Sequence, residues 1–130
     1  MENRFKQHGM FSWNELMTGD VEGSKKFYTE LLGWTLKEFP MGEGGSYWVV
    51  AAGEEEMGGI MGIPPGAEGV PPHWGVYITV DNVDATAKKA EQLGAKSLVP
   101  PTDIPEVGRF AVLQDPQGAA FAIITYLADM

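Results

Sequence analysis

Apolar and polar residues alternate in several short runs of the chain, and each run predicts a β-strand. In "FSWNELMT", Phe11, Trp13, Glu15 and Met17 share one face, and the residues between them take the other. Comparable runs rich in β-branched and aromatic residues predict strands near residues 35–39, 46–52, 59–62, 73–80, 96–99, 109–113 and 120–126.

Two segments follow the helical period instead. Apolar side chains form a helical stripe within residues 21–32, and a second stripe lies within residues 83–93. A glycine follows each stripe, Gly33 and Gly94, at the place where a helix C-cap belongs. The pattern therefore predicts a helix in each segment.

The order of a strand, a helix and three further strands occurs twice along the chain. This repeat predicts a single α+β domain, residues 1–130, built from two βαβββ units at about 10–63 and 73–127. The segment between them, about 64–72, is rich in proline and glycine and is expected to be a linker.

Composition narrows the choice of partners. The net charge is −9, from 18 acidic and 9 basic residues, which argues against nucleic acid and anionic membrane as partners. No apolar run is long enough to span a bilayer, and the first residues do not resemble a secretory signal. Cysteine is absent, so thiolate metal sites are excluded, and we expect a cytoplasmic location.

Two longer motifs resemble a known family. "GDVEGSKKFYTELLGW" is similar to the pattern D-x-x-x-S-x-x-F-Y-x-x-x-L-G-W of the vicinal oxygen chelate superfamily, which includes glyoxalases, bleomycin-resistance proteins and extradiol dioxygenases. "GRFAVLQDPQGAAFAI" resembles that family's strand, D-P-x-G turn and final strand. Together with "SWNELMTGD", these motifs look most like a little-characterised bacterial glyoxalase-like subgroup.

The resemblance implies curved, mostly antiparallel sheets around a cavity, with the helices outside. It also implies a divalent metal held by His or Glu side chains at three positions, which here are Trp13, Gly75 and Ala122. None of these side chains can bind a divalent ion, so we expect no cofactor. The alternative is a displaced metal site that uses Glu15 and His73.

Several residues are candidates for a ligand site in the implied cavity. Glu15 stands on an otherwise apolar strand face, so it is either a general base or hydrogen-bond acceptor or a structural carboxylate. Arg109 could anchor an anionic substrate or form an ion pair, and His73 could be a ligand or a surface residue. The expected lining comprises Trp13, Met17, Trp48, Tyr77 and Ala122, whose small side chain would leave space.

These observations favour a protein that binds a small molecule without the usual metal. An enzyme of lyase or dioxygenase type, with displaced metal ligands or with Glu15 as the base, is the first alternative. An accessory interaction protein is the second. We also expect a homodimer, because relatives pair their units across chains and a small curved sheet leaves strand edges that a partner can cover.

Overall fold

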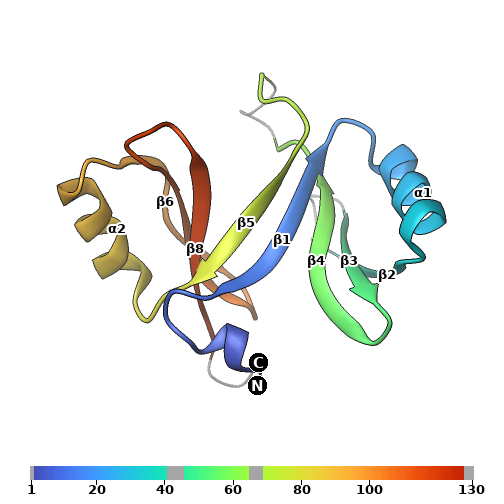
Figure 1. Cartoon of the computed structure of the whole chain (residues 1–130), viewed down its shortest axis with the longest axis horizontal. Helices are drawn as coiled ribbons and strands as arrows, with labels where there is room; N and C mark the ends of the chain where they lie inside the picture. The colour runs from blue at the N-terminus through green and yellow to red at the C-terminus, as the bar shows by residue number, and fades with distance from the viewer. Residues whose placement is uncertain (1, 41–45, 65–68, 128–130) are drawn as a thin grey trace. The chain divides into compact units, whose positions relative to one another are not determined.

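The structure is a computed structural model that describes residues 2–40, 46–64 and 69–127 (Figure 1). The helices expected at 21–32 and 83–93 are both confirmed. The elements, in chain order, are the 3-10 helix η1 (Asn3–Phe5), β1 (Phe11–Thr18), α1 (Val21–Leu32), β2 (Thr35–Pro40), β3 (Ser46–Ala52), β4 (Glu55–Gly62), β5 (His73–Thr79), α2 (Val83–Gln92), β6 (Lys96–Ile104), β7 (Gly108–Gln114) and β8 (Ala120–Tyr126).

The chain forms two compact units. We call residues 14–75 the α1 unit, and residues 1–13 with 76–130 the α2 unit. Strands β1 and β5 are each divided between the two units. The first three residues of β1 belong to the α2 unit, and the first three residues of β5 belong to the α1 unit. The expected linker at 64–72 includes residues 65–68, which lie outside the described residues.

In the α1 unit the strand order is β2-β3-β4-β1. β3 pairs antiparallel with β2 and β4, whereas β1 pairs parallel with β4. The side chain of Asp20 caps α1 by accepting a hydrogen bond from the backbone N–H of Gly23 at 2.9 Å. Gly33 ends the helix in the left-handed region, with φ of 72°, as its position predicted.

One face of this sheet packs against α1. Its buried core consists of Leu16, Val50 and Ile60, and Val21 and Tyr28 of the helix pack against these residues. The helix has no fully buried residue of its own. The opposite face of the sheet is not covered by α1, and we call it the helix-free face.

The α2 unit repeats this plan with the strand order β5-β8-β7-β6. β5 and β8 are parallel, and the other pairs are antiparallel. Asn82 caps α2 by accepting a hydrogen bond from the backbone N–H of Ala85 at 3.0 Å. The core against the helix consists of Val80, Val83, Ala111, Leu113 and Ile123. The α+β class and the repeated βαβββ order are thus confirmed.

Two strands are several residues longer than the sequence predicted. β6 continues through Pro100 and Pro101 to Ile104, with register shifts at Val99. It is the last strand in the order of its unit, and such a position tolerates proline because one side of the strand needs no ladder hydrogen bonds. β4 begins at Glu55, earlier than the expected start near residue 59. In the part of the chain that the structure describes, no helix is long and apolar enough to cross a membrane.

Candidate functional site on the helix-free face of the α1 unit

The helix-free face follows from strand alternation and pairing register. Four residues, one from each strand, face the core between the sheet and α1, namely Leu36, Trp48, Ile60 and Leu16. The residues next to them in each strand therefore project to the other side of the sheet. Four strands contribute to this face, and its residues are Lys37 and Phe39 from β2, Tyr47 and Val49 from β3, Gly59 and Met61 from β4, and Glu15 and Met17 from β1.

Glu15 is the acidic residue of this face. It is 8% exposed, and it pairs in register with Gly59 of β4. Met17 pairs with Met61 two residues further along the same strands. A buried carboxylate among methionines is expensive unless it is hydrogen-bonded or near water. Its position therefore suits an acceptor of hydrogen bonds better than an ordinary packing residue.

Tyr47 lies next to this carboxylate. A Cβ atom built on Gly59 would come within 2.0 Å of both Cζ and Oη of Tyr47, so the phenol end of the ring occupies the space above this glycine. Because Gly59 is the register partner of Glu15, the phenol lies one strand away from the carboxylate, on the same face. Sequence reasoning missed Tyr47. The glycine pair in β4 was the only signal for it.

Trp48, which the sequence suggested as a lining residue, lies on the opposite face of the sheet from Glu15. It packs against the core of Leu16, Val50 and Ile60. The Nζ of Lys25 in α1 lies 3.3 Å from the centroid of its indole ring. Lys25, whose side chain is 15% exposed, is thus part of the packing of the helix.

Trp13 and Ala122, two of the implied metal positions, belong to the α2 unit. The ring of Trp13 lies 6.5 Å from that of Phe5, which also contacts Tyr126 edge-on at 4.8 Å. The hydroxyls of Tyr126 and Ser12 are 2.8 Å apart. Burial raises the pKa of Tyr126, and the bond to Ser12 opposes that rise.

Ala122 is the register partner of both Tyr77 in β5 and Val112 in β7. The ring of Tyr77 lies 6.4 Å from that of Phe110 in β7. Since two strands on either side of a third are about 10 Å apart, these rings lean toward each other over β8. Ala122 is 6% exposed. The small side chain of Ala122 therefore leaves space on β8 that the rings of Tyr77 and Phe110 partly fill.

Arg109 forms two ion pairs in the α2 unit. Its Nε and Nη2 donate to the two carboxylate oxygens of Asp84 at 2.8 and 3.0 Å, and its Nη1 donates to Asp103 at 2.9 Å. The hydrogen bond from Arg109 lowers the pKa of Asp84. The guanidinium thus joins the start of α2 to β6, which favours the ion-pair interpretation over an anchor for an anionic substrate.

The implied metal does not fit the residues present. Trp13, Gly75 and Ala122 offer no side-chain metal ligand. His73 is exposed, and its Nδ1 lies 2.9 Å from the carbonyl oxygen of Pro71. Within residues 2–40, 46–64 and 69–127, the structure brings together no group of three His, Cys, Asp or Glu side chains that could hold a metal ion.

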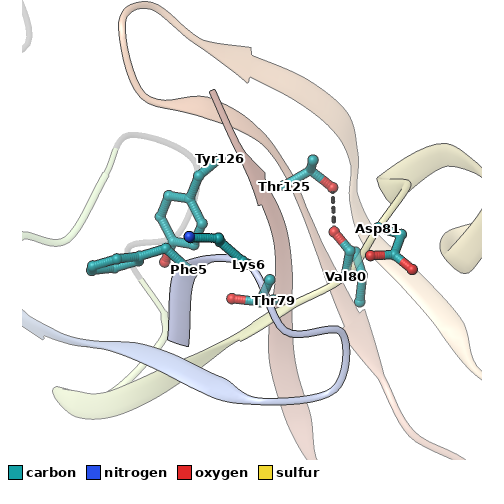
Figure 2. Close-up of a pocket in the computed structure, with 7 residues that line it drawn as sticks. All are labelled: Phe5, Lys6, Thr79, Val80, Asp81, Thr125 and Tyr126. Atoms are coloured by element: carbon teal, nitrogen blue, oxygen red, sulfur yellow. Dashed lines mark hydrogen bonds between the residues drawn. The ribbon is translucent and has the colours of Figure 1, made fainter. Parts of the chain in front are cut away.

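A pocket of about 240 Å³ in the α2 unit lies between the N-terminal segment and the ends of β5 and β8 (Figure 2). Phe5 and Lys6 form one side of it. The polar groups nearby already bind the chain itself. The Thr125 hydroxyl donates to the carbonyl of Val80, and the Thr79 hydroxyl donates to that of Arg4. These hydrogen bonds hold the N-terminal segment in place and occupy the two hydroxyl groups of the pocket. We therefore place the candidate ligand site on the helix-free face instead.

The family profile of the glyoxalase/bleomycin resistance protein/dioxygenase superfamily matches residues 10–123. The chain belongs to this superfamily. The match covers both βαβββ units, and it confirms the kinship that the two sequence motifs predicted.

Two curated proteins are clearly similar to this chain. "Putative glyoxylase CFP32" of Mycobacterium tuberculosis is 46% identical over 116 residues, which cover 89% of this chain and 44% of the relative. "Anthracycline biosynthesis protein DnrV" of Streptomyces peucetius is 35% identical over 127 residues, which cover 88% of this chain and 46% of the relative. The chain thus spans about half the length of these relatives.

Solved structures share the fold at low identity. Methylmalonyl-CoA epimerase from Mycobacterium tuberculosis superposes with a TM-score of 0.68 at 14% identity, covering 93% of this chain and 89% of the epimerase. A variant of homoprotocatechuate 2,3-dioxygenase from B. fuscum gives 0.64 at 16% identity, covering 91% of this chain and 32% of the dioxygenase. At such identities the likeness shows the fold alone.

Proposed function

We propose that this member of the superfamily binds a small organic molecule on the helix-free face of the α1 unit, without a metal ion. The observation that carries the proposal is the placement of Glu15. The residue is 8% exposed and belongs to the face that also holds Tyr47, Met17 and Met61. Aromatic and thioether side chains around one convergent polar group are typical of small-molecule sites.

The relatives support a ligand of this kind. One relative, DnrV, is an anthracycline biosynthesis protein, and anthracyclines are polycyclic aromatic compounds with hydroxyl groups. A carboxylate can accept a hydrogen bond from such a hydroxyl, and this bond needs no metal. A cytoplasmic location is part of the proposal, since the sequence contains no cysteine.

The proposal is tested by thermal-shift screening of small aromatic compounds with EDTA present throughout. Specific ligands raise the melting temperature by mass action, by several degrees when their concentration is about 100 times Kd. Compounds that stabilise the wild type are then titrated by calorimetry against Glu15→Gln, which keeps the shape of the side chain and removes its charge.

Glu15→Gln should weaken binding about tenfold, because a hydrogen bond to a charged acceptor is replaced by one to a neutral amide. Glu55→Gln, an exposed acid in β4, is the matched control and should bind as the wild type does. A screen without any stabilising compound, or ligands that bind Glu15→Gln with unchanged Kd, would refute the proposal. Ligands that lose all affinity in EDTA would refute its metal-free part.

We also propose that the protein is a homodimer. The match to this chain covers only 44–46% of the curated relatives, which are therefore about twice as long. A second copy would bring the assembly to about the length of these relatives. Large apolar side chains are available for such contacts, among them Phe11 at 66%, Leu31 at 61% and Leu93 at 70% exposure. Sedimentation at micromolar concentration tests this, and a monomeric mass would contradict it.

A further inference from the structure

The glycine pair Gly58–Gly59 lies inside strand β4, where glycine weakens a strand unless something needs the space. Each of the two glycines has a separate neighbour. A Cβ on Gly58 would lie 2.4 Å from the backbone oxygen of Asn14 in the adjacent strand, so Gly58 is explained by close backbone packing. A Cβ on Gly59 would lie 2.0 Å from the Tyr47 ring, so Gly59 is explained by a side chain.

This contact fixes where the phenol of Tyr47 can be. The ring starts from β3 and reaches over Gly59 of β4, the strand that lies between β3 and β1. In β1 the register partner of Gly59 is Glu15. A larger residue at position 59 would push the ring away from the sheet and away from the carboxylate.

The surroundings of Tyr47 on this face extend the aromatic surface. Phe39 is its register partner in β2, and the Phe39 side chain is 42% exposed. Met61 lies beside it in β4, and thioether side chains make favourable contacts with aromatic rings. The face therefore combines an aromatic surface with a phenol hydroxyl and a carboxylate, all within neighbouring strands.

We propose that Tyr47, seated by Gly59, is a ligand-binding and specificity-determining residue for planar aromatic compounds that carry a phenolic hydroxyl. The ligand ring packs on Tyr47 and Phe39, and its hydroxyl hydrogen-bonds at the polar end of this face, which is formed by the Glu15 carboxylate and the Tyr47 phenol. This inference rests on the proposed function, and it adds both the class of ligand and the residue that selects it.

The test uses the whole chain and two probes, 2-hydroxyanthraquinone and anthraquinone, titrated by calorimetry in EDTA. The wild type should bind the hydroxylated probe more tightly, because only that probe can donate to Glu15. Tyr47→Phe keeps the ring and removes the hydroxyl, and should weaken binding of 2-hydroxyanthraquinone about fivefold. The same change should alter the affinity for anthraquinone by less than about twofold.

Two further variants test the ring itself. Tyr47→Leu should weaken both probes about tenfold or more, because the aromatic contact is lost. Gly59→Ala should also weaken both, since it displaces the ring without altering its chemistry. Tyr28→Phe removes a hydroxyl from α1 in the same unit, where it accepts a hydrogen bond from Trp74 at 3.1 Å, and should leave both affinities unchanged.

Wild-type affinity for 2-hydroxyanthraquinone in Tyr47→Phe and Tyr47→Leu would overturn the inference and leave the proposed function intact. Failure of the wild type to bind either probe would also overturn it, whereas the proposed function would still be judged by its own screen. Urea unfolding of every variant establishes that it is folded. If Gly59→Ala does not fold, the two Tyr47 variants decide the outcome.

Discussion

The guanidinium of Arg109 binds both carboxylate oxygens of Asp84, at 2.8 and 3.0 Å, and so ties strand β7 to the first turn of α2. This pair has a consequence for acid stability. The hydrogen bond from Arg109 holds the pKa of Asp84 below its ordinary value of 3.8. Because the folded-state pKa is lowered, the pair stabilises the fold above about pH 4 and loses that contribution as the pH falls through the folded-state pKa.

We therefore expect Asp84→Asn to melt at a lower temperature than the wild type at pH 7. The gap between the two melting temperatures should begin to narrow below about pH 4, because the carboxyl of Asp84 then binds a proton more readily in the unfolded chain than in the folded one. Thermal melts followed by circular dichroism across this range measure the gap. Glu91→Gln, an exposed acid on α2, serves as the control and should show no such gap. A gap that is the same at pH 7 and pH 3 would contradict the interpretation.

Glu106 has a backbone conformation that favours glycine. Its φ is 67°, and it follows Pro105 in a turn closed by a hydrogen bond from the Val107 N–H to the Ile104 carbonyl at 3.0 Å. This is the pattern of a type II turn, whose third position suits glycine. Glu106→Gly should raise the free energy of unfolding by about 0.5–1 kcal/mol.

Urea denaturation measures this change. Glu106→Ala is the matched variant, since it removes the carboxylate but retains a Cβ atom, and it should leave stability close to that of the wild type. Equal stabilisation by alanine and glycine would show that the charge, and not the backbone, is responsible.

Lys25 stabilises α1 through its ammonium group. The Nζ atom lies 3.3 Å from the centroid of the Trp48 ring and 3.0 Å from a carboxylate oxygen of Glu22. Lys25→Met keeps an apolar stem but removes the charge, and should lower the free energy of unfolding by about 1 kcal/mol. Lys26→Met, at an exposed position on the same helix, should change it by less than half as much. Similar losses for both variants in urea denaturation would contradict the cation–π contact.

Much of the fold could be read from local sequence signals. Asp20 and Gly33 mark the ends of α1 by their capping chemistry, and the structure uses both residues in these roles. The two-residue period of β1 placed Glu15 among apolar neighbours, and the structure keeps it buried at 8% exposure. Such signals act within a few residues, so a single sequence contains them.

The site could be predicted only in part, because faces and partners depend on pairing between distant strands. In "SYWVVAA" both faces are apolar, so the sequence cannot tell whether Tyr47 or Trp48 faces Glu15. The register of Trp48 with Ile60 decides it. Likewise, nothing near Arg109 in the sequence indicates that Asp84 is its partner.

The most direct test of the central claim follows the methionine methyl groups by NMR. Met17 and Met61 are register partners on the helix-free face, whereas Met57 packs against the core under α1. The protein is labelled with [13C-methyl]methionine and titrated with 2-hydroxyanthraquinone in EDTA. Our account predicts that the ring current of the bound probe shifts the Met17 and Met61 methyl signals while that of Met57 stays in place. A shift of Met57 without Met17 and Met61, or no shift at saturating probe, would contradict it.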